Sequence, residues 1–403
     1  MNVLFISISG IPHLSGHSIS LDLLRELKSR GHNVYVVGSN ERRNKVPTTL
    51  SEEEGCSVLR VKIGNNKNTN VIEKGITNMM LPHQYTAAIK KYFKGIKFDL
   101  VLYPTPPVTQ VDTVAYIKKR DNAKTYLLLK DIFPQNAVDI GMMRKSGIKG
   151  IIYKTFRKKE KKLYRISDYI GCMSQANVDY IIKHNPDIDP KKVHVNPNTI
   201  EIVENVLPEE KKREIKEKYN IPLNAKTFIY GGNLGRPQDI PFVIECLKAN
   251  EGKSDRFFIV CGKGTEYKKL ETYVNERKPD NVLLLNGLPK EEYEEFVKAF
   301  DIGLIFLDHR FTIPNFPSRL LSYMQSHMPV IACTDVNTDI GKVIVEGGFG
   351  WWCESDSTDG FTEIIDQACK AELAPMQENA IKYLYDHYDT KISCDTLLKW
   401  VDK

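Results

Sequence analysis

The stretch that decides the fold runs from Asp301 to Cys333 and reads DIGLIFLDHRFTIPNFPSRLLSYMQSHMPVIAC. Its apolar runs predict strands over 302–307 and 330–333, with a helix over about 318–325 between them. Pro317 stops any helix upstream, and Ser318 is placed to cap the first N–H groups of the next one. This order of elements is typical of an α/β sheet.

The start of that helix is a candidate anion site. Free backbone N–H groups and the helix dipole attract negative charge, and Arg319 adds a guanidinium fork that suits phosphate oxygens. The residues favour a diphosphate as the ligand. An ordinary capped helix with a surface arginine explains the same residues equally well.

Length and composition indicate two folded domains. A chain of 403 residues is too long for one core, and 41% hydrophobic with 27% charged residues is normal for a globular protein. The eight cysteines form no CxxC pair, which indicates free thiols in a reducing compartment. We see no signal peptide and no apolar run of the roughly 18 residues that span a bilayer, so we expect a cytoplasmic protein.

The first half begins with a strand over 3–7, a helix over about 18–29 and a strand over 34–37. Gly10 and Gly16 in the first loop do not fit GxGxxG, so no dinucleotide site is predicted. Gly16 either lets a ligand approach the backbone or only shapes a turn. Further strands are predicted over 57–63, 100–103, 125–129, 170–173 and 193–195. Ligands of such sheets bind beyond the strands' carboxyl ends, which makes loops 105–107 and 130–135 candidates for the active face.

The second half repeats this organisation. Strands are predicted over 227–230, 257–261 and 282–285, and glycines follow each of them. A charged helix over 207–219 is a plausible linker region. We therefore predict an α/β protein of two Rossmann-like doubly wound domains that face each other across a cleft, and the cleft is the default ligand site.

A strongly basic segment extends from Arg144 to Arg165, with ten lysines or arginines and one acid, Glu160. Ile152 and Phe156 recur at helical spacing while lysines crowd the other side. Such a helix fits an anionic bilayer surface, where each basic residue contributes on the order of 1 kcal/mol. A solvated helix that packs its apolar stripe on its own domain is the alternative. No nucleic-acid module is recognisable, so no nucleic acid is expected as a partner.

Three motifs occur in the order GGNLGRPQD, Gly262 to Gly264, and PNFPSRLLSYM, and LLLKDIFPQNAVDIG resembles the segment RDLWPESAV. With these motifs the chain resembles retaining glycosyltransferases of family 4, which have the GT-B fold. The likeness covers nearly the whole chain. It is nearest to the bacterial branch that builds capsule and O-antigen, which includes fucosamine-type transferases.

The resemblance implies transfer of a sugar from a nucleotide diphosphate donor, commonly UDP-linked, with no metal and no other cofactor. The positions that match the donor site are Gly16, Gly232, Asn233, Arg236, Lys263, Gly287, Leu288, Ser318, Arg319 and Leu320. Fixed cations and N–H groups would stabilise the charge that builds on the departing diphosphate. The one DxD, Asp187 to Asp189, lies in a loop, where turn and cap chemistry is the better interpretation.

The chain departs from the family at its usual pair of glutamates, which align with Pro314 and Ser322. Lys130 stands where many relatives carry a histidine near the acceptor. We take Lys130 and its neighbour Asp131 as the catalytic candidates, with Asp131 as the group that accepts a proton. A carboxylate that caps the following turn is the alternative for Asp131.

The family's organisation implies an acceptor-binding domain over 1–200, a donor-binding domain over 201–384, and a final helix over 385–403 that packs back on the first domain. The basic helix and the resemblance together indicate a polyprenyl-diphosphate-linked saccharide as acceptor. The enzyme would then associate peripherally with the inner face of the cell membrane. The residues expected to face the membrane and acceptor are Lys154, Arg157, Lys158 and Lys161.

Two other functions fit the same architecture. A UDP-sugar 2-epimerase-type isomerase would use the donor alone, with acid and base residues on both faces of the sugar. A non-catalytic module that binds nucleotide sugars is conceivable because the glutamate pair is missing.

Overall fold

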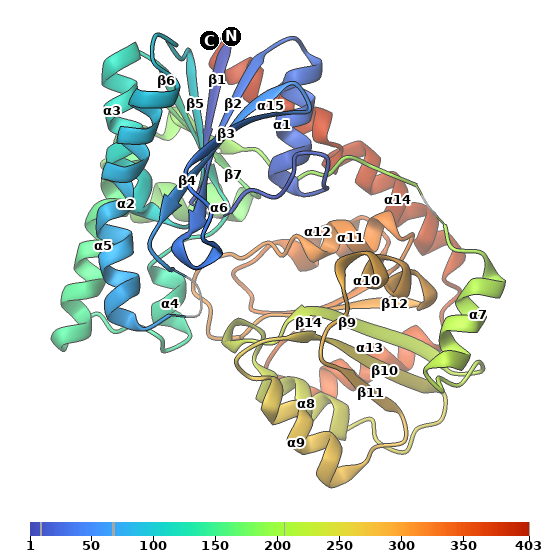
Figure 1. Ribbon diagram of the computed structural model, residues 1–403. Helices are drawn as coiled ribbons and strands as arrows, with labels where there is room; N and C mark the ends of the chain where they lie inside the picture. Colours follow the sequence, from blue (N-terminus) through green and yellow to red (C-terminus); the bar gives the residue numbers. More distant parts are fainter. Residues whose placement is uncertain (9, 67–68, 205, 403) are drawn as a thin grey trace. The chain divides into compact units, whose positions relative to one another are not determined.

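The computed structural model describes residues 1–8, 10–66, 69–204 and 206–402. The chain divides into two compact units, and each contains one sheet (Figure 1). Unit 1 comprises Met1–Glu201 with Asp389–Lys403, and unit 2 comprises Ile202–Tyr388. Within the described residues, no helix combines the length and the apolar character needed to cross a bilayer.

Unit 1 is built on an eight-stranded sheet with the order β3-β4-β2-β1-β5-β6-β7-β8. The strands are β1 (Asn2–Ile6), β2 (Asn33–Glu41), β3 (Thr49–Glu53), β4 (Cys56–Ile63), β5 (Leu100–Thr105), β6 (Lys124–Leu129), β7 (Tyr169–Cys172) and β8 (Val193–Val195). All neighbours pair in parallel except β3 with β4. Helices cover both faces, so the inner strands are continuous apolar runs.

The helices of unit 1 connect these strands, and short 3₁₀ turns lie at the loops. They are α1 (Ile19–Ser29), α2 (Val71–Tyr92), α3 (Val111–Asp121), α4 (Gln135–Asp139), α5 (Gly147–Ile166), α6 (Gln175–His184) and α15 (Thr390–Val401), with η1 (Arg42–Asn44), η2 (Val108–Gln110) and η3 (Pro190–Lys192). Helix α1 is capped by Ser18, whose side chain accepts a hydrogen bond from the backbone N–H of Leu21.

Unit 2 has a six-stranded parallel sheet in the order β11-β10-β9-β12-β13-β14. Its strands are β9 (Lys226–Asn233), β10 (Arg256–Lys263), β11 (Val282–Leu285), β12 (Ile302–Phe306), β13 (Val330–Thr334) and β14 (Gly350–Glu354). Its helices are α7 (Glu209–Lys218), α8 (Ile240–Lys248), α9 (Tyr267–Arg277), α10 (Lys290–Phe296), α11 (Arg319–Gln325), α12 (Ile340–Glu346), α13 (Thr358–Lys370) and α14 (Ala374–Tyr388), with η4 (Arg236–Gln238) and η5 (Val297–Ala299). The predicted fold class, two doubly wound sheets, is confirmed.

The structure corrects the sequence prediction at three places. Strand β3 was not expected, because its residues TLSEE are polar and pair only at the edge of the sheet. Strand β14 was also missed, since its glycine and two tryptophans gave no alternating pattern. The cap assigned to Ser318 is wrong. Its backbone is already helical, with φ −64° and ψ −11°, and its side chain makes no capping hydrogen bond.

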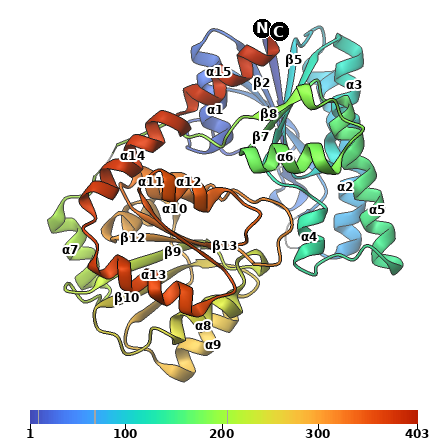
Figure 2. The same cartoon turned by 180° about the vertical axis from the view of Figure 1, so that it is seen from behind.

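The last helix, α15, completes the core of unit 1. Cys394, Leu397 and Val401 are buried in one cluster with the leucines of α1, and Figure 2 shows the two helices side by side. The chain crosses from α14 to α15 at Asp389, which forms a parallel bridge with Ile200. Residues 385–388 therefore close α14 in unit 2, and the helix in unit 1 begins later than the expected residue 385.

We predict that Leu397→Ala lowers the stability of unit 1 by about 2–5 kcal/mol, because it leaves a cavity among fully buried side chains. Urea unfolding followed by the fluorescence of Trp400 measures this, in a background where Trp351 and Trp352 are phenylalanine. Lys399→Ala, on the exposed side of the same helix, is the matched control. Equal unfolding midpoints for the two variants would contradict the packing role of α15.

Candidate active site

In unit 2, the strand order reverses between β9 and β12, which makes the carboxyl end of β9 a topological switch point. The strand ends there in Gly231, Gly232 and Asn233. Neighbouring β10 ends in register beside it, with Lys263 opposite Asn233. Doubly wound sheets bind ligands beyond the carboxyl ends of their strands, at the topological switch point. The ends of β9 and β10 are therefore the candidate ligand site of unit 2.

The two glycines at these ends are required by close packing. A Cβ at Gly262 would lie 2.0 Å from the carbonyl oxygen of Gly232. Gly232 itself has φ +136°, and a Cβ there would lie 2.3 Å from Nη2 of Arg319. Arg319, at the first position of α11, therefore rests directly on the backbone of Gly232.

The guanidinium of Arg319 is partly buried among tyrosines. Its Nη1 donates to the hydroxyl of Tyr293 at 3.0 Å, and its central carbon lies 5.7 Å from the centroid of that ring. Burial lowers the pKa of Arg319, but the nearby hydroxyls of Tyr323, Tyr293 and Tyr230 outweigh it, so the pKa lies above its ordinary value. No carboxylate of the described chain forms an ion pair with Arg319. A charged group that has lost water without gaining a counter-ion is a strong anion-binding group.

Two further cations lie around the same strand ends. Arg236 stands in η4 and Lys263 at the end of β10, and both side chains are exposed. The lysine side chain passes close to Gly287, where an added Cβ would lie 3.0 Å from its Cε. Neither cation has an ion-pair partner in the part of the chain that the structure describes. Together with Arg319 they place three cations without ion-pair partners among the described residues around this end of the sheet.

The other donor-site residues expected from the sequence are distributed as follows. Asn233 donates through Nδ2 to Oε1 of Gln238 at 2.9 Å and so orders the loop after β9. Leu320 is fully buried and packs in the core, and Ser318 exposes its side chain. Leu288 follows Gly287, which has φ +69°. Gly16 belongs to unit 1, where its carbonyl accepts from Nη1 of Arg25 at 2.6 Å.

The sequence analysis missed Tyr293 and Tyr323, which surround Arg319. Tyr293 occurs in the charged helix segment KEEYEEF and Tyr323 on the buried side of α11. The hydroxyl of Tyr323 accepts from the N–H of Gly231 at 3.2 Å, so it also holds the loop of β9 in place. No local pattern reveals these roles, because the partners are 26 or more residues away in the chain.

Unit 1 contains a pocket of about 810 Å³ beyond the carboxyl ends of β1, β2, β5 and β6. The lining residues are Ile8, Gly10, Ser39, Glu41, Arg43, Asn44, Asn66, Lys74, Asn78, Pro106, Pro107, Val108, Thr109, Phe133 and Phe156. One part of this lining is apolar, and the rest carries amides, hydroxyls, two basic side chains and the carboxylate of Glu41, which pairs with Arg43 at 2.8 Å. Thr109 is buried, and its Oγ1 has no hydrogen-bond partner within the described residues. The pocket thus suits a ligand with both an apolar and a polar part.

Lys130 and Asp131 follow β6, at the same end of the sheet as the pocket. Burial lowers the pKa of Lys130 to about 7, and its ammonium has no hydrogen bond or ion pair with described residues. Burial raises the pKa of Asp131 to about 6. Its carboxylate accepts from the N–H of Ile132 at 2.7 Å and from Nδ2 of Asn136 at 2.6 Å. Asp131 therefore does cap the turn, and it can also hold a proton near neutral pH.

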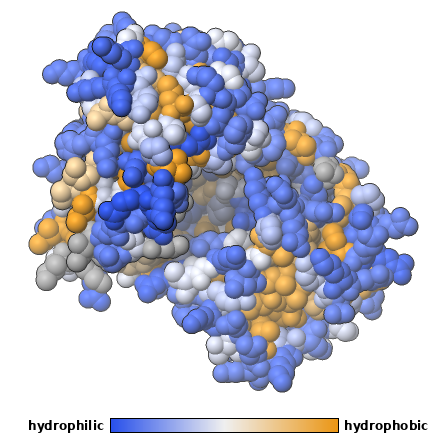
Figure 3. Space-filling model, in the orientation of Figure 1, coloured by the Kyte–Doolittle hydropathy of each residue, from blue (hydrophilic) through white to orange (hydrophobic). Residues whose placement is uncertain are grey.

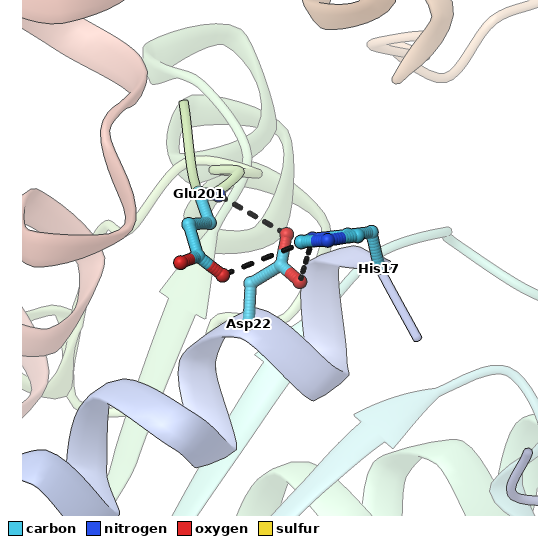
Figure 4. A group of neighbouring side chains, drawn as sticks. All are labelled: His17, Asp22 and Glu201. Carbon is cyan, nitrogen blue, oxygen red and sulfur yellow. Dashed lines mark hydrogen bonds and ion pairs between the residues drawn. The ribbon is translucent and has the colours of Figure 1, made fainter. Parts of the chain in front are cut away.

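His17, Asp22 and Glu201 form a cluster in unit 1 (Figure 4). Nη2 of Arg25 lies 2.7 Å from Oδ1 of Asp22 and 2.8 Å from Oε2 of Glu201. The N–H of Glu201 also donates to Asp22 at 3.1 Å. Since the guanidinium of Arg25 bridges both carboxylates, the cluster acts as a clamp between the first loop and the end of the first chain segment.

Of the two aspartates of the DxD motif, Asp189 makes the predicted cap, whereas Asp187 forms an ion pair instead. Asp187 accepts from Arg165, with 3.0 Å between Oδ2 and Nη2, on the surface beside α5. Asp189 accepts from the N–H of Lys191 at 3.0 Å and so caps η3.

Two protein-family models match the chain and together span most of it. Residues 19–204 match the model described as Glycosyltransferase Family 4, and residues 211–387 match Glycosyl transferases group 1. A curated relative, the probable glycosyltransferase WbjE of Pseudomonas aeruginosa, is 22% identical over 336 residues. The match covers 82% of this chain and 80% of the relative.

Solved structures resemble the chain over its full length. Sucrose-phosphate synthase from Thermosynechococcus elongatus has a TM-score of 0.75 at 13% identity, over 99% of this chain and 97% of that one. The Anabaena protein HepE, solved in complex with UDP and glucose, has a TM-score of 0.70 at 13% identity, over 100% and 99%. The fold is therefore GT-B. With the family models, the comparisons support a glycosyltransferase.

We predict that Arg319→Ala lowers kcat by at least about tenfold, since it removes the buried charge that faces the anion site. Arg319→Lys should recover part of the loss, because it keeps the charge but not the fork. Release of nucleoside diphosphate measures the rate. Arg277→Ala, an exposed arginine of α9, is the control, and a loss below twofold for Arg319→Ala would contradict its role.

The depressed pKa of Lys130 predicts that unit 1 becomes more stable as the pH rises from about 7 to 10. In this window the unfolded lysine still binds a proton, with an ordinary pKa near 10.4, while the buried amine does not. Lys130→Met should flatten this rise in the denaturation midpoint, and Lys97→Met, on the surface, should leave it intact. An unchanged slope in Lys130→Met would show that another group causes the pH dependence.

Proposed function

We propose that the protein is a retaining glycosyltransferase whose donor is a nucleotide diphosphate sugar of the UDP class. The observation that carries this proposal is the guanidinium of Arg319, partly buried on Gly232 and without a carboxylate partner among the described residues. A diphosphate would supply the missing negative charge. The complex of HepE with UDP and glucose supports a donor of this type.

In the proposed reaction, the bond between the anomeric carbon and the diphosphate oxygen breaks, and an acceptor hydroxyl oxygen bonds to that carbon. Negative charge accumulates on the departing diphosphate, where Arg319, Arg236 and Lys263 stabilise it. We propose that these cations serve in place of a metal ion. Pro314 and Ser322 stand at the positions of the family's two glutamates and carry no carboxylate. Other groups must therefore take the roles of that pair.

The proton of the acceptor hydroxyl needs a destination. We assign it to Asp131, whose pKa of about 6 lets the carboxylate accept a proton near neutral pH. Lys130 is the second candidate, since an amine with a pKa of about 7 is partly neutral at working pH. Both groups follow β6 at the carboxyl edge of the sheet in unit 1, beside the loop of the pocket residue Phe133.

For the acceptor, we propose a polyprenyl-diphosphate-linked saccharide, used to build a bacterial surface polysaccharide such as capsule or O-antigen. The mixed lining of the unit 1 pocket suits such an amphipathic molecule. The sugar transferred would be a hexose or an N-acetylhexosamine, including the fucosamine type. The enzyme would work in the cytoplasm, held peripherally at the inner face of the cell membrane by α5 and its basic residues.

The test is release of UDP from a panel of UDP-sugars, with and without a polyprenyl-diphosphate-linked saccharide. We expect release only when donor and acceptor are both present, and undiminished release in EDTA. Asp131→Asn should slow transfer more than it weakens donor binding measured by thermal shift. Asp139→Asn, in the adjacent α4, serves as the control for an altered carboxylate.

Other outcomes would select another function. An epimer formed from the donor alone would identify an isomerase. Donor binding with no UDP release for any acceptor would identify a binding module. Loss of activity in EDTA, restored by a divalent ion, would overturn the assignment of charge stabilisation to the three cations alone.

A further inference from the structure

The basic residues of α5 differ in their partners along the helix. In its C-terminal half, Lys162 pairs with Asp112 at 2.6 Å, and Arg165 pairs with Asp187 at 3.0 Å. Lys161 also lies 4.0 Å from Asp187. Much of the positive charge in this half of the helix is therefore balanced within unit 1.

Arg157, near the middle of α5, is likewise engaged. Its Nη1 donates to the buried Glu160 at 2.5 Å and its Nη2 to Oδ1 of Asn185 at 2.7 Å. Of the four residues predicted to face a membrane, Arg157 and Lys161 thus have internal partners.

Apart from Arg157, the basic residues from the start of α5 to just past its middle lack such compensation where their side chains are described. Lys154, Lys158 and Lys159 form no ion pair with any described residue. Arg144 and Lys145 precede the helix, are exposed, and also form no ion pair in the described chain. Among the described side chains, the unpaired positive charge of the basic segment therefore lies between Arg144 and Lys159, before the balanced C-terminal part of α5.

Exposed apolar side chains occur along the same part of α5 and on the neighbouring helix α2. Ile151 and Ile152 of α5 are 66% and 49% exposed. On α2, the exposed apolar residues are Ile76, Met79 and Met80, at 59%, 73% and 47%. Isolated apolar residues on a surface are common. Five exposed apolar residues on two neighbouring helices, near unpaired lysines, instead form a group of the kind that marks an interaction surface.

The topology of unit 1 explains why these residues gather. Helices α2 and α5 each lead into a parallel strand, β5 and β7, so both run against the strand direction and begin at the carboxyl edge of the sheet. Figures 1 and 2 show both helices beginning at that end, and Figure 3 shows hydrophobic side chains there among hydrophilic ones. Asn78 of α2 and Phe156 of α5 line the same pocket, which places the two helices next to each other.

We propose that this end of unit 1 is a docking surface for an anionic lipid bilayer. Its apolar members, Ile76, Met79, Met80, Ile151 and Ile152, enter the boundary between headgroups and acyl chains. Its cations, Lys154, Lys158 and Lys159, contact the lipid phosphates. The combination favours a bilayer, because net positive charge beside large apolar side chains matches an anionic surface over a hydrocarbon layer.

This inference rests on the proposed function and refines it. The pocket lies beyond the same edge of the sheet and takes part of its wall from both helices. A lipid-linked acceptor keeps its hydrocarbon chain in the bilayer and its diphosphate at the surface. If this end of unit 1 binds the bilayer, the pocket would therefore reach the saccharide while the hydrocarbon chain of the acceptor stays in the membrane.

The first test is sedimentation with vesicles of phosphatidylcholine containing phosphatidylglycerol, at low and high salt. Wild-type binding should weaken with salt but persist in part, because inserted apolar groups are not screened. The triple variant Ile76→Gln, Met79→Gln, Ile151→Gln should bind at least tenfold more weakly at high salt. The variant Lys154→Gln, Lys158→Gln, Lys159→Gln should lose binding mainly at low salt.

A matched control uses equally exposed apolar residues of unit 2. Leu223→Gln with Val345→Gln, at positions 50% and 55% exposed, should bind vesicles as the wild type does. Insertion is measured directly by quenching with brominated lipids. A tryptophan at position 79, from Met79→Trp, should be quenched strongly, whereas one from Leu223→Trp should not.

Equal vesicle binding of the glutamine triple variant and the wild type, or no quenching at position 79, would overturn the inference. So would dissociation of a wild-type oligomer by the same triple variant in vesicle-free buffer, because the surface would then bind a second copy. UDP release with a short-chain, water-soluble acceptor should be unchanged in the triple variant. If vesicle binding behaves as expected but no UDP is released from any donor, only the proposed function fails.

Discussion

The contact between Arg319 and Gly232 determines the chemistry of unit 2. A guanidinium can rest on a strand end only where no Cβ intervenes, and Gly232 meets this requirement with a φ that other residues rarely adopt. Tyr293 and Tyr323 hold the arginine and the loop in place without neutralising the charge. The fold thus holds the guanidinium of Arg319 at the switch point of a parallel sheet with no carboxylate partner among the described residues. An anionic ligand would balance its charge.

Both units place their candidate site groups at the carboxyl edge of their sheets, but the two sets of groups differ in character. Unit 2 presents cations from β10, η4 and the start of α11 around the end of β9, a suitable arrangement for a compact, highly charged group. Unit 1 presents a larger pocket with an apolar part, and beside it two titratable groups whose pKa values burial has moved toward neutrality. This division matches the proposed substrates, a small charged donor and a large amphipathic acceptor.

The sequence predicted the two sheets well, because parallel strands buried on both faces appear as apolar runs followed by glycines. It failed at β3 and β14, whose residues do not show that pattern, and at Ser318, whose helical backbone rules out the expected cap. Site residues that lie within a sequence motif, such as Arg236 in GGNLGRPQD and Arg319 in PNFPSRLLSYM, could be proposed from the sequence. Tyrosines around Arg319 and the ion pairs that balance half of α5 could not, because they depend on residues distant in the chain.

The bridge between Ile200 and Asp389 has a topological consequence. The chain leaves unit 1 after Glu201 and returns at Asp389, and these two crossing points are adjacent in space. In sequence, unit 2 is therefore an inserted domain, placed between residues 201 and 389 of unit 1. Unit 2 could be deleted and residues 201 and 389 joined by a short linker, so that each unit is expressed as a separate polypeptide.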